Sequence, residues 1–201
     1  WNPTGYLYSK EEILQLAAIA KKYDIFLIFD EVYREFVYDG AQHFSIMQVS
    51  DIEQNAIMID SVSKRFSMCG ARIGWVVSKN KEVMKSILKF AQARLSPPTY
   101  SQIGAEKAFD VPESYFEEVL KEYTQRRNVL IDALQKVEGV RVSMPKGAFY
   151  CIAEFPVENA EDFCIWLLDQ FSVDNETVML APAEGFYATK GIGRNQVRIA
   201  Y

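Results

Sequence analysis

Two short, unbroken apolar runs constrain the fold of this chain more than any other feature. Residues 25–29 read Ile-Phe-Leu-Ile-Phe and end in Asp30, and residues 56–59 read Ala-Ile-Met-Ile and end in Asp60. Apolar runs of this length are typical of parallel strands that are buried on both faces. Residues 31–55, between the runs, are expected to be mostly loop. The pattern predicts an α/β fold built on an open, mostly parallel sheet.

Helical patterns flank these strands. Ser9 is followed three residues later by Glu12, a capping-box pattern that predicts a helix over residues 9–23. A third strand is predicted at 72–77. A helix from about residue 80 to 95 follows it and should end before the prolines at 97 and 98, because proline disfavours helix in the residue before it.

The sequence changes character after Gly139. A long helical pattern begins near Ser114 and ends at that glycine, and the residues beyond it alternate short strand-like runs with one helical pattern. The expected strands are 140–143, 148–155, 178–181 and 196–200, and the expected helix is 161–171. We predict three parts, namely the C-terminal part of a large α/β domain (1–112), a connecting helix (113–138) and a small α+β domain (139–201). Because the chain opens on a turn sequence and stops on a strand-like run, we expect it to be a fragment.

Composition excludes several classes of function. The net charge of -5 argues against a general nucleic-acid binder, which would carry a basic face. No apolar run approaches the roughly 20 residues of a membrane span, so no membrane partner is expected. The three cysteines are in no metal spacing and favour a reduced, cytoplasmic setting over a disulfide framework. With His43 as the only histidine, no metal site is expected.

Polar residues where the strands end form the candidate site. Ligands of open α/β sheets bind outside the carboxyl ends of the strands, where Asp30, Ser61 and Lys64 are expected. Desolvation lowers the pKa of a lysine and makes its amine a nucleophile suited to Schiff-base chemistry. Arg72 follows shortly, and a guanidinium suits a phosphate dianion. Asp30 could pair with a protonated ring nitrogen. Together these residues suit a phosphorylated, pyridine-like cofactor.

Five segments, in order along the chain, carry a resemblance to a known family. They are Asn2-Pro3-Thr4-Gly5, Asp30-Glu31-Val32-Tyr33, Ser61-Val62-Ser63-Lys64 with Gly70-Ala71-Arg72-Ile73-Gly74, Gly147-Ala148-Phe149-Tyr150 and Val197-Arg198-Ile199. In order and spacing they resemble the signatures of class I and II aminotransferases of fold type I, the aspartate-aminotransferase type. Each motif alone is weak, but five in series are specific. The resemblance implies the C-terminal part of a fold-type I enzyme that uses pyridoxal 5'-phosphate.

The resemblance also implies a role for each matching residue. Lys64 would carry the cofactor as a Schiff base and then move the proton between substrate and cofactor. Asp30 would keep the pyridine nitrogen protonated, and Tyr33 and Asn2 would donate hydrogen bonds to the phenolic oxygen of the cofactor. Lys64 is thus the expected catalytic residue, and all four residues belong to the expected cofactor-binding set.

Three further positions complete the expected site, and a fourth departs from the family pattern. Ser61 and Arg72 would hold the cofactor phosphate, and Arg198 would bind the α-carboxylate of the substrate in a two-pronged salt bridge that lysine cannot reproduce. Ala71 stands where the aspartate-specific branch usually has tryptophan, which puts an aspartate preference in doubt and leaves the amino-acid donor open.

We therefore predict a pyridoxal-phosphate-dependent aminotransferase that moves an amino group between an amino acid and a 2-oxo acid, as a homodimer in the full-length protein. One alternative is a C–S β-lyase, because Lys64, Asp30 and Arg72 would serve that reaction equally. A second is the non-catalytic, aminotransferase-like domain of a transcription regulator. Because the remaining parts of the family's site precede these residues, the isolated fragment is expected to be inactive.

Overall fold

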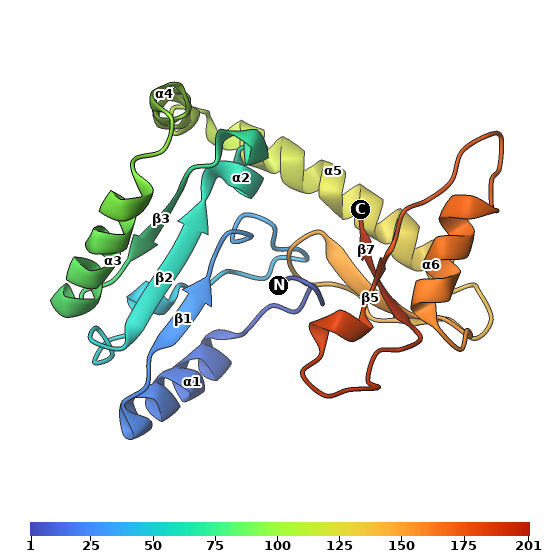
Figure 1. The fold of residues 1–201 in the computed structure, drawn as a ribbon, viewed down its shortest axis with the longest axis horizontal. Helices are drawn as coiled ribbons and strands as arrows, with labels where there is room; N and C mark the ends of the chain where they lie inside the picture. Colours follow the sequence, from blue (N-terminus) through green and yellow to red (C-terminus); the bar gives the residue numbers. More distant parts are fainter. The chain divides into compact units, whose positions relative to one another are not determined.

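The computed structural model describes residues 1–201, and the chain forms two compact units. One unit comprises Tyr8–Glu118, and the other comprises Trp1–Leu7 together with Val119–Tyr201. Figure 1 shows the elements of both units in sequence colours. The unit boundary falls within the long helix α5 (Glu113–Leu134). The predicted parts 1–112, 113–138 and 139–201 divide the chain differently and stay a prediction.

The unit Tyr8–Glu118 is built on a three-stranded sheet in the order β1-β2-β3. Strand β1 (Leu27–Asp30) pairs parallel with β2 (Ala56–Ser61), and β2 pairs antiparallel with β3 (Gly74–Val77). The helical elements of the unit are α1 (Lys10–Tyr23), η1 (Ile46–Gln48), α2 (Val62–Arg65), η2 (Cys69–Ala71), α3 (Lys81–Arg94) and α4 (Thr99–Ala108). The predicted α/β class is confirmed, and the third predicted strand is antiparallel.

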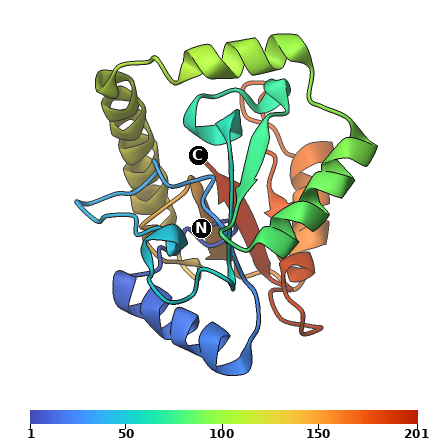
Figure 2. The same cartoon turned by 90° about the vertical axis from the view of Figure 1, so that its left-hand side faces the viewer.

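One face of the sheet is closed by α1. The Ser9 hydroxyl accepts from the amide of Glu12, and the Glu12 carboxylate accepts from the amide of Ser9, so the predicted capping box is present. Ile13 of α1 belongs to the same buried apolar cluster as Phe29 of β1 and Met58 of β2. Helices α1 and α3 lie on opposite sides of the sheet (Figure 2). Burial of this apolar face is what holds the short strands in place.

A separate apolar cluster fixes the segment that follows β2. Val62 and Phe66 are buried together with Ala105 of α4, and Phe116 packs against them. A helix of four residues such as α2 is too short to be stable by itself. Its position therefore depends on these tertiary contacts.

The other unit contains a second, wholly antiparallel sheet in the order β4-β5-β7-β6. Its elements are β4 (Arg141–Val142), β5 (Tyr150–Glu154), α6 (Ala160–Asp169), β6 (Ala181–Pro182), η3 (Glu184–Phe186) and β7 (Gln196–Ala200). Its core joins Ile131 of α5 to Cys151 of β5, Cys164 of α6 and Val197 of β7. The predicted strand at 178–181 is wrong for its first three residues, since β6 begins at Ala181.

The N-terminal turn packs closely against the loop before β5. The carbonyl of Gly5 accepts hydrogen bonds from the amides of Lys146 and Gly147 at 3.0 and 2.9 Å. Gly5 has a φ of +71°, and a Cβ added to it would lie 2.5 Å from both the Cβ of Pro145 and the carbonyl oxygen of Tyr150. Only glycine fits this backbone conformation and this close approach.

Two expectations drawn from the composition concern the cysteines and membrane-spanning segments. All three cysteines are free, with Cys69 exposed and the other two buried. Burial raises the pKa of the Cys151 thiol to about 11, which makes it unreactive. No helix is both long enough and apolar enough to cross a membrane.

Candidate functional site

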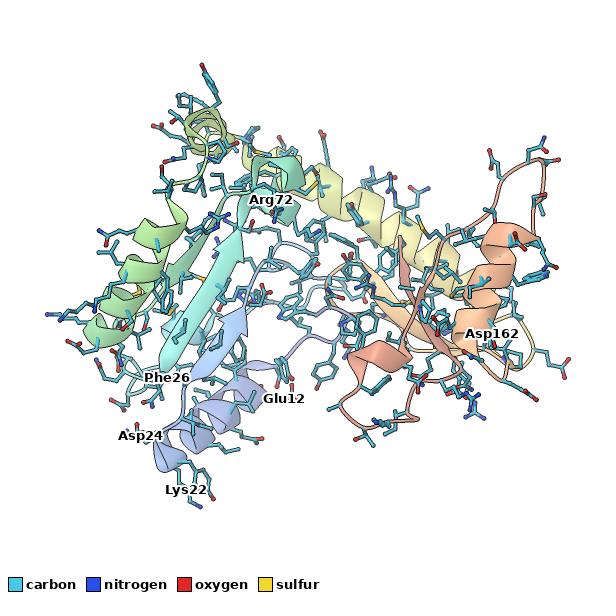
Figure 3. The ribbon with its side chains drawn as sticks, viewed as in Figure 1. Glu12, Lys22, Asp24, Phe26, Arg72 and Asp162 are labelled. Atoms are coloured by element: carbon cyan, nitrogen blue, oxygen red, sulfur yellow. The ribbon has the colours of Figure 1, made fainter.

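The strand order brings four of the predicted site residues, namely Asp30, Ser61, Lys64 and Arg72, to one edge of the first sheet. Asp30 is the last residue of β1, and Lys64 lies in α2, directly after β2. Because β1 and β2 are parallel, their carboxyl ends meet at the same edge. Strand β3 runs the other way, with Gly74 paired to Ser61, so Arg72 also lies there. Figure 3 shows Arg72 beside α2, at the end of the sheet opposite Phe26.

Two hydroxyls and a guanidinium border one hollow at this edge. The hydroxyl oxygens of Ser61 and Ser63 are 2.7 Å apart, and the Ser61 hydroxyl also contacts the carbonyl of Ile73 at 2.6 Å. Ser61 caps α2 by accepting from the amide of Ser63 at 3.0 Å. These serines and Arg72 border a hollow of about 440 Å³ that lies partly under Ile87 of α3. The Arg72 guanidinium donates to the carbonyl of Cys69 at 2.9 Å. Hydroxyls and a guanidinium are donors suited to a phosphate group, so these residues fit a phosphorylated cofactor.

The turn after β1 carries Asp30 and Tyr33. The Asp30 carboxylate accepts from the amide of Val32 at 3.1 Å and so closes the turn. Tyr33 is buried, with its ring 6.5 Å from the ring of Phe36. Both side chains are therefore held at the carboxyl end of β1 by local contacts.

A buried carboxylate outside the predicted site set holds the loop after this turn. Glu31 is fully buried and accepts from the His43 ring at 2.9 Å, the Ser45 hydroxyl at 2.8 Å and the amide of Ile46 at 3.0 Å. Burial acts to raise the pKa of Glu31, but the hydrogen bonds from His43, Ser45 and Ile46 and the charge of His43 together lower it. His43, which lies in the segment expected to be mostly loop, is thus part of a buried network.

A second unpredicted feature is an ion cluster of Arg34, Glu35, Asp60 and Arg65. The Arg65 Nη2 atom lies 2.8 Å from a Glu35 oxygen and 3.4 Å from an Asp60 oxygen, and Arg34 approaches the same Asp60 oxygen at 3.4 Å. The side chain of Asp60 is fully buried, and that of Arg65 is 5% exposed. Burial raises the pKa of Asp60 to about 6, against the opposing effects of the Ser61 amide and Arg34. The sequence signal for this cluster is the adjacency of Asp60 to Ser61 and of Arg65 to Lys64.

The other unit holds the two remaining predicted residues. Arg198 lies on β7 and donates from Nη1 to the Asn2 side-chain oxygen at 3.0 Å. Its guanidinium also lies over the rings of Tyr150 and Phe186, 4.8 and 5.0 Å from their centroids. These contacts orient the guanidinium, and its other nitrogen atoms suit a carboxylate.

The edge of the first sheet therefore belongs to an α/β protein that carries a lysine, an acid, two hydroxyls and a guanidinium where β1 and β2 end. The family model for class I and II aminotransferases matches residues 1–199. The chain belongs to the class I and II aminotransferase family.

Two relatives show how closely the sequences correspond. The aspartate aminotransferase of Bacillus sp. (strain YM-2) is 33% identical over 205 residues, which cover 100% of this chain and 50% of the relative. Aromatic-amino-acid aminotransferase 2 of Thermococcus litoralis is 30% identical over 202 residues, with the same coverage. The chain thus spans about half the length of the curated relatives it matches.

Solved structures agree with the fold. Aspartate aminotransferase from Thermotoga maritima superposes with a TM-score of 0.83 at 30% identity, covering 100% of this chain and 49% of that one. The α-aminoadipate aminotransferase of Thermus thermophilus, complexed with N-(5'-phosphopyridoxyl)-L-leucine, superposes with a TM-score of 0.85 at 25% identity, covering 100% and 51%. The expected fold and the expected cofactor, pyridoxal 5'-phosphate, are confirmed at the level of the family.

Proposed function

We propose that this chain is the cofactor-holding and C-terminal part of an enzyme that transfers an amino group from an amino acid to a 2-oxo acid. The observation that carries the proposal is the edge of the first sheet. There Lys64 lies in the short helix α2, which follows β2 directly and is capped by Ser61, and two hydroxyls with an arginine border an adjacent hollow. Family membership over residues 1–199 supports the same reaction class.

Each residue at this edge has a role that follows from its chemistry. Lys64 would hold pyridoxal 5'-phosphate covalently through its amine and, once released, would move a proton to and from the substrate Cα. Ser61 and Arg72 would bind the phosphate. Asp30 would hold a proton on the pyridine nitrogen, and Tyr33 would donate to the phenolic oxygen. When bound, the cofactor supplies an electron sink for the charge that develops at Cα.

We assign two residues of the other unit to binding. Arg198 would bind the α-carboxylate of the substrate, since a fixed guanidinium matches a carboxylate in a two-pronged geometry. Asn2, which accepts a hydrogen bond from Arg198, would donate from its amide nitrogen to the phenolic oxygen of the cofactor. A substitution of Arg198 by lysine keeps the charge but loses the fork, so it should raise KM for both substrates.

The proposal extends to assembly and location. We propose a homodimer in the full-length protein, as in the family it belongs to, and a cytoplasmic setting consistent with three free cysteines. The amino-acid donor is left open because the relatives include aspartate and aromatic-amino-acid aminotransferases.

Borohydride reduction of the full-length protein loaded with pyridoxal phosphate tests the lysine assignment. We expect peptide mapping to find the reduced cofactor on Lys64, and Lys64→Ala to lose both the visible absorption band and the label. Lys79→Ala, which removes an exposed lysine from a 3.7 Å surface pair with Glu53, is the matched control and should keep both. A label on another lysine would show that the assignment is wrong.

Single-turnover reactions with a panel of amino acids test the reaction class. Transfer predicts conversion of the cofactor to its colourless amine form together with the matching 2-oxo acid. Release of pyruvate and ammonia would identify a β-lyase instead. Cofactor binding without turnover of any amino acid would favour a regulatory domain.

A further inference from the structure

The ion cluster around Arg65 lies directly behind the segment that carries Lys64. Residues three and four apart lie on one face of a helix, and Val62, Arg65 and Phe66 have this spacing and are all buried. Ser63 and Lys64 lie between them in sequence, on the other side of the turn, and are only partly buried. The burial of Arg65 therefore helps to decide which way Lys64 faces.

Arg65 ties this turn to two other segments of the same unit. Its guanidinium lies 2.8 Å from Glu35, in the segment that follows β1, and 3.4 Å from Asp60, on β2. Arg34 contacts the same Asp60 oxygen. Tyr33 precedes Arg34 directly in sequence, so the cluster joins the turn that bears Tyr33 to the turn that bears Lys64.

Stability alone does not account for a buried arginine here. The Nε and Nη2 atoms of Arg65 and the Oδ2 atom of Asp60 are buried without a hydrogen bond of good geometry. Desolvation of buried ions offsets much of their attraction, and well-packed apolar side chains in their place are often neutral or stabilising. A four-residue helix also needs external contacts to hold its position.

We propose that Arg65 is a positioning residue, which sets the direction of the Lys64 amine by anchoring the back of α2 to Glu35 and Asp60. The inference rests on the proposed function, because it assigns to Arg65 a part in placing the lysine that would hold the cofactor. It concerns orientation through a neighbouring residue, and Arg65 itself touches neither substrate nor cofactor.

Two variants of the full-length protein separate positioning from charge balance. Arg65→Met removes the anchor and leaves two acids facing one arginine. Arg65→Met/Glu35→Gln removes one charge of each sign and leaves Arg34 with Asp60. Arg126→Met is the matched control, because it breaks a 2.8 Å pair with Glu122 in which both side chains are about half exposed. Such surface pairs contribute little to stability.

We expect Arg65→Met to lower kcat by about 100-fold with little change in KM, since misplacing a reacting group by about 1 Å has an effect of that size. Backbone amides of residues 63–67 should exchange hydrogen faster in the cofactor-free protein. The paired variant should regain the unfolding midpoint lost by Arg65→Met but not its kcat, and Arg126→Met should match the wild type in every measurement.

Recovery of both midpoint and kcat in the paired variant would overturn the proposal, because the cluster would then only balance charge. A wild-type kcat and wild-type exchange in Arg65→Met would do the same. If that variant fails to fold, the paired variant alone carries the comparison. Failure of borohydride to label Lys64 in the wild type would instead contradict the proposed function, and the exchange measurement would still test the role of Arg65.

Discussion

Removing the Glu31 carboxylate should destabilise the protein more than any exposed substitution in the same unit. Its two oxygens accept from the ring of His43, the hydroxyl of Ser45 and the amide of Ile46, all between 2.8 and 3.0 Å. Glu31→Ala leaves these three donors in a buried place without an acceptor. The loop between β1 and η1 then loses the contact that closes it.

The expected magnitude follows from the number and kind of these bonds. A hydrogen bond to a charged group contributes about 1.5–3 kcal/mol net, but bonds in one network do not add fully. Breaking a buried, charged contact typically costs about 3–5 kcal/mol. We expect a loss of about 4 kcal/mol for Glu31→Ala, which is large against the roughly 5–15 kcal/mol of a whole domain. Glu31→Gln keeps an oxygen for Ser45 and Ile46 and should lose about 1–2 kcal/mol.

The pH dependence supplies a second test of the same carboxylate. The pKa of Glu31 is lowered from its ordinary value of 4.5, so the charged form is favoured more in the folded than in the unfolded protein. The stability that this adds is present above pH 4.5 and is lost as the pH falls through the lower, folded pKa. The difference in unfolding free energy between wild type and Glu31→Gln should therefore become smaller below pH 4.5.

Urea unfolding of the full-length, cofactor-free protein, followed by tryptophan fluorescence from about pH 3.5 to pH 8, measures both effects. Glu53→Ala is the matched control, since Glu53 is more than a third exposed and makes only a 3.7 Å surface pair with Lys79. A surface pair contributes at most about 1 kcal/mol to stability. If the unfolding free energy of Glu31→Ala is within about 1 kcal/mol of that of Glu53→Ala, the buried network is not what orders the loop.

Two further substitutions test the buried acid of the ion cluster and the N-terminal turn. Burial raises the pKa of Asp60 from 3.8 to about 6, so the stability linked to its protonation is present below pH 3.8 and is lost as the pH rises through 6. Asp60→Asn has no carboxyl group at this position and so does not lose this stability as the pH rises. The unfolding free energy of Asp60→Asn minus that of wild type should therefore increase between about pH 4 and pH 7, measured by urea unfolding at each pH. An unchanged difference would contradict the raised pKa. Gly5→Ala should destabilise by about 3 kcal/mol, because it combines a positive φ with clashes against Pro145 and Tyr150. Gly40→Ala has a φ of +72° and open space around it, and should lose only about 1 kcal/mol by the same measurement.

Elements that depend on residues close together in sequence could be predicted from it. Elements that depend on a partner far away in sequence could not. The capping box at Ser9 is confirmed because its bonds join residues three apart. The strand predicted at 178–181 has only Ala181 in β6, because a strand needs a partner and the ladder between β6 and β7 includes only Ala181 and Pro182 of this segment. Val178 and Met179 are apolar but exposed, so their composition was misleading.

Buried charged side chains were harder to predict from the sequence than the strands. Arg127 lies in the long helical pattern predicted from near Ser114, and it is 2% exposed and donates to the carbonyl of Pro145 at 3.0 Å. A charge in a helical pattern normally indicates the solvated face. Only the loop that supplies the carbonyl reveals why this arginine is inside, and that loop is 18 residues away in sequence.

Three pairs of adjacent polar residues explain why the candidate site could be predicted from the sequence and the buried charges behind it could not. In Asp30-Glu31, Asp60-Ser61 and Lys64-Arg65, one member was predicted as a site residue and the other is buried. Successive side chains point to opposite faces of a strand, and next neighbours on a helix also diverge. In these three pairs, one residue lies at the edge of the sheet and its neighbour is buried. A charge in that second position needs buried partners, which come from distant segments such as the turn after β1. Consecutive polar residues at a buried strand end thus indicate both a site and a charged network behind it.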